Sequence, residues 1–231
     1  MTNTNQITWT NKSVLSFAGN IDPIKAIERA TRDLVNLARQ KGWSGPPFNP
    51  VFIAKLLNIQ IEANTNIADA RTISSDGDTR IEYNPRQARE RVRFSIAHEI
   101  AHLLFPDAAE RVRNRGGTKD IADDWQLELL CNLAASEFVM PFGSLASKNS
   151  VSSIEELMVE RRKFDVSAEA FLTRIIHGCV VRVAQAFESR YFSVNDAESS
   201  SFTDRPPYHD AVYFHLARFV TLKRQTDPSQ F

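Results

Sequence analysis

The sequence has little cysteine and no excess of either charge. Its 231 residues include only two cysteines, Cys131 and Cys179, so there is no disulfide framework, and the economical interpretation is reduced thiols in a cytosol. Lys plus Arg and Asp plus Glu each total 28, which leaves no overall basic field to hold a nucleic-acid backbone. We therefore expect a cytoplasmic protein that does not bind DNA or RNA directly.

Long apolar runs are also missing. Nowhere do about 18 apolar residues follow one another, which is the length that a membrane-spanning helix needs. The start, Met1–Trp9, is polar and lacks the apolar core of a signal peptide. Glycine-rich phosphate loops, Cys-x-x-Cys pairs and internal repeats do not occur either. With 42% hydrophobic and 24% charged residues, the composition is that of an ordinary globular protein, and we expect one that is neither secreted nor inserted in a membrane.

Helix and strand signals begin near residue 22. Asp22 is placed to cap a helix, Pro23 suits its first turn, and Gly42 follows a series of apolar residues at helical spacing. The pair Asn49-Pro50 repeats the start signal, and the turn residues 74–78 indicate a hairpin between two short strands. The predicted elements are a helix at 22–42, a short helix at 51–57, a strand at 59–63 and hairpin strands at 70–73 and 80–83.

The next hundred or so residues are mainly helical in pattern. Asn84-Pro85 predicts the start of a helix that Pro106 ends, and Met140-Pro141 ends a second helix that is almost wholly apolar. Ser153 and Ser167 are placed to cap two further helices. The predicted elements are helices at 84–106, 121–139, 154–162 and 168–177, a strand at 180–187, a polar linker at 193–207 and a frayed tail at 225–231. This order indicates an α+β fold with a mainly helical core, a small β-sheet and a C-terminal α/β extension.

The helix predicted after Asn84 carries His98, Glu99 and His102 in the pattern His-Glu-x-x-His. A separation of four places both imidazoles on one helix face about a turn apart, where both can reach one metal ion. Glu99 lies one position round from His98, so it can address a metal-bound water without being a ligand. Zinc lowers the pKa of such a water, and a carboxylate beside it can accept the proton and later deliver it to the leaving amine. The competing interpretation is a half-buried helix that carries two histidines by chance, which leaves two polar rings without partners.

A catalytic zinc site has three protein ligands and one open position, so a third ligand must lie elsewhere. Glu128 is the best candidate, because an ionised carboxylate in the middle of an apolar helix is costly to bury unless it meets a cation. It belongs to a polar stripe with Asp124 and Asn132, which could also be the solvent-exposed face of that helix. Cys131 is interpreted as a small core residue. The other candidate ligands are Glu137, His177, His209 and His215.

Three stretches of the sequence resemble the ImmA/IrrE family of zinc metallopeptidases. They are Arg-Phe-Ser-Ile-Ala-His-Glu-Ile-Ala-His at 93–102, Glu-Leu-Leu-Cys-Asn at 128–132 and Phe-Val-Met-Pro at 138–141. The similarity extends over roughly 47–178. Leu130 and Ala134 depart from the family pattern, but neither is one of the four residues of the proposed site.

The resemblance implies that His98, His102 and Glu128 hold a zinc ion and that Glu99 is the catalytic base. It also implies a zincin-like core and the activity of a zinc-dependent endopeptidase, which hydrolyses peptide bonds by a Glu-activated zinc-bound water. Members of this family cleave helix-turn-helix transcriptional repressors or trigger their loss. A repressor of that kind is therefore the expected protein substrate of a cytoplasmic regulatory protease.

A non-proteolytic zinc-binding module that binds and displaces a repressor is the alternative function. The complete motif favours the enzyme, because a module that only binds has no need of Glu99. A purely structural zinc site is disfavoured, since such sites are normally closed by four Cys or His ligands. Tyr83, Arg93 and His177 are candidates for the group that stabilises the oxyanion. The expected division is a flexible segment at 1–20, a metallopeptidase domain at 21–178 and a C-terminal extension at 179–231.

Overall fold

A computed structural model describes residues 7–75, 78–108, 124–145 and 154–175. Residues 9–171 form one compact unit, and residues 1–8 with 172–230 belong to another. In the described part of the chain, no helix combines the length and the apolar character that crossing a membrane requires. The boundaries predicted after residues 20 and 178 stay predictions. The strand, linker and tail predicted beyond residue 178 lie outside the described residues.

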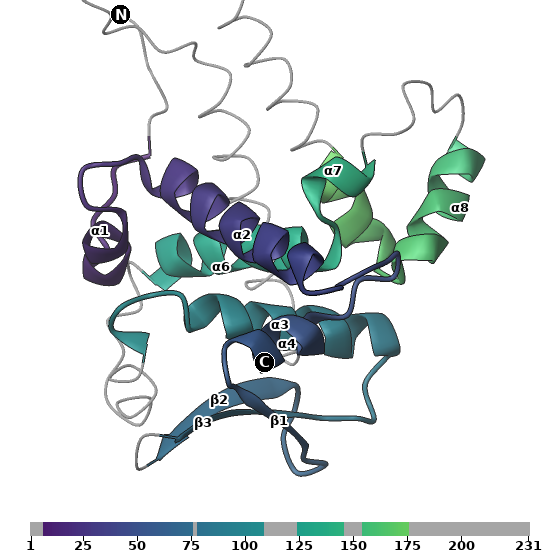
Figure 1. Cartoon of the computed structure of the whole chain (residues 1–231), viewed down its shortest axis with the longest axis horizontal. Helices are drawn as coiled ribbons and strands as arrows, with labels where there is room; N and C mark the ends of the chain where they lie inside the picture. The colour runs from purple at the N-terminus through teal and green to yellow at the C-terminus, as the bar shows by residue number, and fades with distance from the viewer. Residues whose placement is uncertain (1–6, 76–77, 109–123, 146–153, 176–231) are drawn as a thin grey trace, which may run out of the picture. The chain divides into compact units, whose positions relative to one another are not determined.

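The larger unit is layered, with helix α4 (Arg89–His102) in its middle (Figure 1). On one side α4 packs against a small sheet, and on the other side it packs against α6 (Asp124–Val139). Helix α2 (Pro23–Gln40) packs against α6, and α3 (Pro50–Leu56) packs against α4. The predicted α+β class, mainly helical with a small sheet, is therefore confirmed for the described residues.

The sheet has the strand order β1-β3-β2. Its strands are β1 (Gln60–Ala63), β2 (Ala70–Ser75) and β3 (Asp78–Tyr83). The last two pair antiparallel, with Thr72 opposite Ile81, which confirms the predicted hairpin, while β1 pairs parallel with β3. Both Thr72 and Ile81 are buried. In this sheet β2 is therefore an edge strand that brings a buried threonine toward α4.

Helices α2 and α3 begin where the sequence predicts. Oδ1 of Asp22 accepts the backbone N–H groups of Ile24 at 3.1 Å and Lys25 at 3.2 Å, and Asn49 caps α3 in the same way. After α2, Gly42 has φ of +93°, a left-handed conformation that glycine adopts without a steric cost. The buried side of α2 is formed by Pro23, Ile24, Ile27, Thr31, Val35 and Ala38.

Helix α4 begins at Arg89 and not at the predicted Asn84-Pro85. The side-chain amide of Asn84 donates to the carbonyl oxygen of Ile67 at 2.7 Å, and its Oδ1 accepts the backbone N–H of Arg86 at 2.9 Å. An asparagine that bonds to the backbone two residues on forms an Asx turn, which resembles a helix cap in sequence. The predicted start was therefore wrong, because Asn84 holds the turn between the hairpin and the helix.

Helix α1 (Lys12–Ala18) was not predicted and lies inside the segment 1–20 that was expected to be flexible. That expectation is wrong for these residues, because part of the helix is buried and Asn11 caps it. The reason lies far along the chain: Oε1 of Gln126, on α6, accepts the backbone N–H groups of Thr10 at 2.8 Å and Asn11 at 2.9 Å. Because Gln126 is more than a hundred residues away in the sequence, its contacts with Thr10 and Asn11 leave no local pattern from which α1 could be predicted.

The remaining described helices follow α6. They are α7 (Phe142–Leu145), α8 (Ile154–Phe164) and a helical stretch at 168–175. Oγ of Ser167 accepts the backbone N–H of Ala170 at 3.1 Å, so its predicted capping role is confirmed. The capping role predicted for Ser153 lies outside the described residues.

Candidate metal centre

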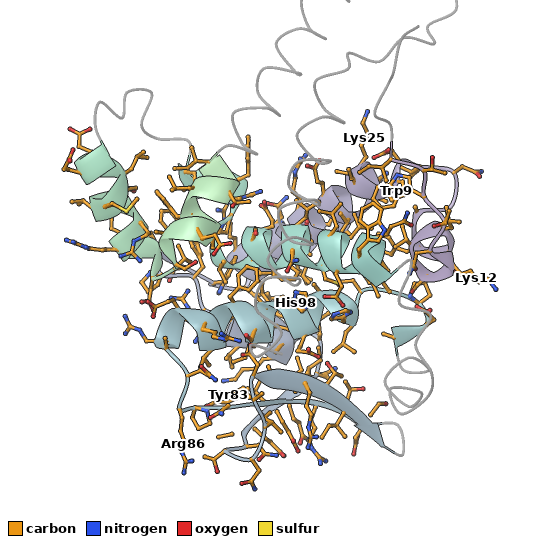
Figure 2. The ribbon with its side chains drawn as sticks, turned by 180° about the vertical axis from the view of Figure 1, so that it is seen from behind. Trp9, Lys12, Lys25, Tyr83, Arg86 and His98 are labelled. Carbon is orange, nitrogen blue, oxygen red and sulfur yellow. The ribbon has the colours of Figure 1, made fainter. Side chains whose placement is uncertain are left out.

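Helices α4 and α6 run antiparallel where they face each other. His98 contacts Asn132, while His102, one turn further along α4, contacts Glu128 and Cys131, which come earlier in α6. Figure 2 shows His98 on the side of α4 toward α6. The polar stripe of α6 therefore faces α4 at Glu128 and Asn132, and its interpretation as a solvent-exposed face is wrong for these two residues.

The three predicted ligands come together between the two helices. Nε2 of His98 lies 3.2 Å from Oε2 of Glu128, and Nε2 of His102 lies 3.5 Å from Oε1 of the same carboxylate. The two Nε2 atoms are 3.1 Å apart. The ligand atoms of these three residues all lie within 4.8 Å of one another. Among the described residues, this is the only group of three or more His, Cys, Asp or Glu side chains that could hold a metal ion. The arrangement could hold a metal ion.

The surroundings of His98 favour a positive charge. Burial alone would lower the pKa of His98, but the hydrogen bond and charge of Glu128, with smaller contributions from Glu99 and Asn132, outweigh burial and raise that pKa. The side chains of His98, His102 and Glu128 are each only about one-fifth exposed or less. A cation between the helices would therefore meet partly desolvated donors and a carboxylate.

Glu99 points toward the sheet. Successive helical residues lie about 100° apart round the axis, so the residue after His98 faces a different neighbour. Oε2 of Glu99 accepts two hydrogen bonds from Thr72 on β2, from the backbone N–H at 2.7 Å and from the hydroxyl at 2.6 Å. Both residues are buried. Glu99 is not a member of the group of converging donors, although its charge acts on His98.

Arg93 is a candidate for the group that stabilises the oxyanion, but the hydrogen bonds of its side chain join α4 to other parts of the fold. Its guanidinium donates to the backbone carbonyl of Phe48, to that of Phe164 at 3.2 Å, and to Oδ2 of Asp165 at 2.9 Å. Asp165 also accepts from Arg89 at 2.8 Å. Arg93 therefore ties α4 to the chain before α3 and to the end of α8.

Of the other candidates, Glu137 is not one of the converging donors. Buried Glu137 accepts the backbone N–H of Phe142 at 3.0 Å, so this carboxylate lies at the start of α7. Tyr83 lies on the sheet side of α4 (Figure 2). The three remaining candidate histidines, His177, His209 and His215, lie outside the described residues.

A comparison with known protein families matches residues 57–175 to the family described as the IrrE N-terminal-like domain, Peptidase M78. The matched region covers just over half of the 231 residues and contains His98, Glu99, His102 and Glu128. The chain belongs to this family. No curated protein matches the sequence. The family match confirms the resemblance, and it supports a metallopeptidase-family role for the site between α4 and α6.

The match to the IrrE N-terminal-like domain starts only at residue 57, so helices α1, α2 and α3 all precede the matched region. Helix α2 nevertheless packs against α6, which carries Glu128. The part of the chain before the family domain therefore supports the helix that brings the third donor to the two histidines.

Proposed function

We propose that this member of the IrrE N-terminal-like family is a zinc-dependent endopeptidase. The observation that carries the proposal is the convergence of His98, His102 and Glu128, with Glu99 buried beside them and outside the donor group. Two imidazole nitrogens and a carboxylate oxygen are ligands of catalytic zinc sites, which keep a further position open, whereas structural sites are closed by four protein ligands. The residues present therefore fit zinc in a catalytic site.

His98 and His102 from α4 and Glu128 from α6 would hold the ion. Zinc bound there supplies a Lewis acid that polarises the scissile carbonyl and makes water acidic enough to react near neutral pH. Glu99 accepts a proton from the water that attacks the carbonyl carbon, and delivers it to the amine nitrogen as the C–N bond breaks. The two hydrogen bonds from Thr72 hold the Glu99 carboxylate in position before substrate arrives.

The proposed substrate is a helix-turn-helix transcriptional repressor. Its support is the resemblance to the ImmA/IrrE family together with the charge balance, since equal numbers of basic and acidic residues give the chain no overall attraction to DNA. The equal numbers of basic and acidic residues are consistent with a protein that binds a repressor and does not bind the DNA site of that repressor.

The test is to co-express the wild type or Glu99→Gln with candidate helix-turn-helix repressors. We expect repressor loss with the wild type alone, and a defined cleavage product with the purified proteins that a zinc chelator abolishes. Equal repressor loss with both forms would overturn the proteolytic function and favour the module that binds and displaces a repressor, because Glu99 is not needed for binding.

A further inference from the structure

The two rings of His98 and His102 each have a second partner on α6. Nδ1 of His98 lies 3.0 Å from Oδ1 of Asn132, and Nδ1 of His102 lies 3.4 Å from Sγ of Cys131. Both Nε2 atoms face the carboxylate of Glu128. The ring nitrogens are thus sorted: the two ε atoms point into the candidate site and the two δ atoms point to adjacent residues of one helix.

This sorting matters because a neutral imidazole carries its hydrogen on one nitrogen only. An amide oxygen only accepts hydrogen bonds, so in a neutral His98 the contact with Asn132 favours the hydrogen on Nδ1, which leaves the lone pair on Nε2 for a metal ion. A thiol sulfur can accept a hydrogen bond weakly, so a neutral His102 with its hydrogen on Nδ1 can donate to Cys131. The contact with Asn132 therefore favours the tautomer that a metal bound at Nε2 requires, and the contact with Cys131 is compatible with that tautomer.

The spacing of residues on α6 allows this one helix to supply both the candidate ligand Glu128 and the partners of the two Nδ1 atoms. Glu128, Cys131 and Asn132 are at positions i, i+3 and i+4, which lie on one face of a helix. Cys131 is fully buried, so water does not replace its contact with His102, and Asn132 is partly buried. Loss of either side chain would leave a desolvated ring N–H that has lost its acceptor.

We infer that Cys131 and Asn132 are positioning residues for the metal centre, which hold His102 and His98 in the Nε2-binding tautomer. The inference rests on the proposed zinc site and adds to it a function for Cys131 beyond filling the core. The two contacts are unequal, because an amide oxygen is a stronger acceptor than a thiol sulfur. Replacing Asn132 therefore weakens zinc binding more than replacing Cys131 does.

The test measures zinc affinity by competition with a chromophoric chelator in the full-length protein. Outer partners of ligating histidines typically contribute about 10- to 100-fold in metal affinity, so Cys131→Ala and Asn132→Ala should each bind zinc that much more weakly. Cys131→Ser and Asn132→Asp keep an acceptor and should recover most of the affinity. Ser136→Ala is the matched control, because its hydroxyl donates to the backbone oxygen of Asn132 at 2.8 Å and not to a histidine.

Two further measurements separate positioning from a general structural effect. The cobalt(II)-substituted protein should show a changed visible spectrum in both alanine variants and not in Ser136→Ala. In the zinc-loaded wild type, nitrogen-15 spectra of the histidine rings should show both His98 and His102 protonated at Nδ1. That measurement needs no variant, so a hydrogen on Nε2 of either ring would contradict the inference even if an alanine variant fails to fold.

Each outcome has one meaning. Unchanged zinc affinity in both alanine variants, or a hydrogen on Nε2 of either ring in the zinc-loaded protein, would overturn the positioning role and leave the zinc site intact. A wild type that binds no zinc would overturn the zinc site and this inference together. A wild type that binds zinc but cleaves no repressor would remove the proposed substrate only.

Discussion

Glu99 is a buried carboxylate of α4 that accepts hydrogen bonds from Thr72 on the edge strand β2. Glu99→Gln keeps the shape of the side chain and removes its ability to take a proton from water. We expect this variant to keep its zinc and its fold while cleavage of the repressor falls by about 10²-fold or more, the usual size of general-base catalysis. Metal analysis and turnover measured on the same preparation check this. Wild-type turnover in the variant would point to another base.

Thr72 holds the same carboxylate from the sheet, through its backbone N–H and its hydroxyl. Thr72→Val removes only the hydroxyl bond. A hydrogen bond to a charged group is worth about 1.5–3 kcal/mol, and about 1.36 kcal/mol corresponds to tenfold in rate, so turnover should fall by at most about 10- to 100-fold. Thr72→Ser is the control and should retain turnover. Zinc content should be unchanged in both, since Thr72 is not in the donor group; a Val variant as active as the wild type would show that the hydroxyl is dispensable.

At the scale of helices, the proposed metal centre would join α4 to α6, because its candidate ligands His98, His102 and Glu128 lie on these two helices. A metal that binds only the folded protein stabilises it, by about 2.7 kcal/mol at a free concentration of 100 times the Kd. The purified protein should bind about one zinc ion per chain, and zinc should raise its thermal midpoint. Both His98→Ala and Glu128→Ala should lose most of the zinc and of this shift. Glu137→Gln is the matched control, because Glu137 bonds to the start of α7; full zinc content in Glu128→Ala would mean that the third ligand is misassigned.

A second junction ties α4 to the end of α8 through Asp165, which accepts from Arg89 and Arg93. Burial acts to raise the pKa of Asp165, but the hydrogen bonds and charges of the two arginines outweigh it and lower that pKa. A carboxyl group whose pKa is lower in the folded state stabilises the fold above its unfolded pKa, near 3.9, and loses that contribution as the pH falls through the folded value. The contribution should therefore be complete at neutral pH and disappear in acid.

Asp165→Asn tests this junction without backbone strain, because Asp165 has φ of +56° and asparagine tolerates that left-handed conformation. We expect a loss of roughly 1–3 kcal/mol in the free energy of unfolding at pH 7, measured by urea denaturation, for a hydrogen-bonded charge that is mostly buried. The difference between wild type and variant should shrink as the pH falls below about 4. A difference that stays constant with pH would mean that the charge of Asp165 contributes nothing.

At the scale of the whole molecule, the family domain ends at residue 175 and all four proposed site residues lie within it. The proposed protease needs a surface that recognises its repressor, and we expect that surface in the segment from Cys179 to the C-terminus. Deleting residues 193–231 should impair cleavage of the repressor and leave zinc content unchanged. Thermal unfolding of the zinc-loaded variant checks that the rest of the chain stays folded. Intact cleavage after the deletion would place recognition within the remaining chain.

Local sequence determined the part of the site that lies on single helices. The spacing of His98, Glu99 and His102 determines their angular positions on α4, because an α-helix repeats every 3.6 residues. The burial cost of a lone carboxylate on an apolar helix makes Glu128 a candidate ligand from the sequence alone. Caps such as Asp22 were predictable for the same reason, since each acts on the backbone within a few residues.

Tertiary packing decided everything that joins one element to another. Local periodicity shows that α6 has a polar stripe but not which neighbour that stripe faces, and only the packing against α4 brings Glu128 and Asn132 to the histidines. The contact between Thr72 and Glu99 spans 27 residues, and the contact between Gln126 and Asn11 spans 115. Such contacts leave no trace in a short window of sequence, because they depend on how helices and strands pack and not on the propensity of either segment.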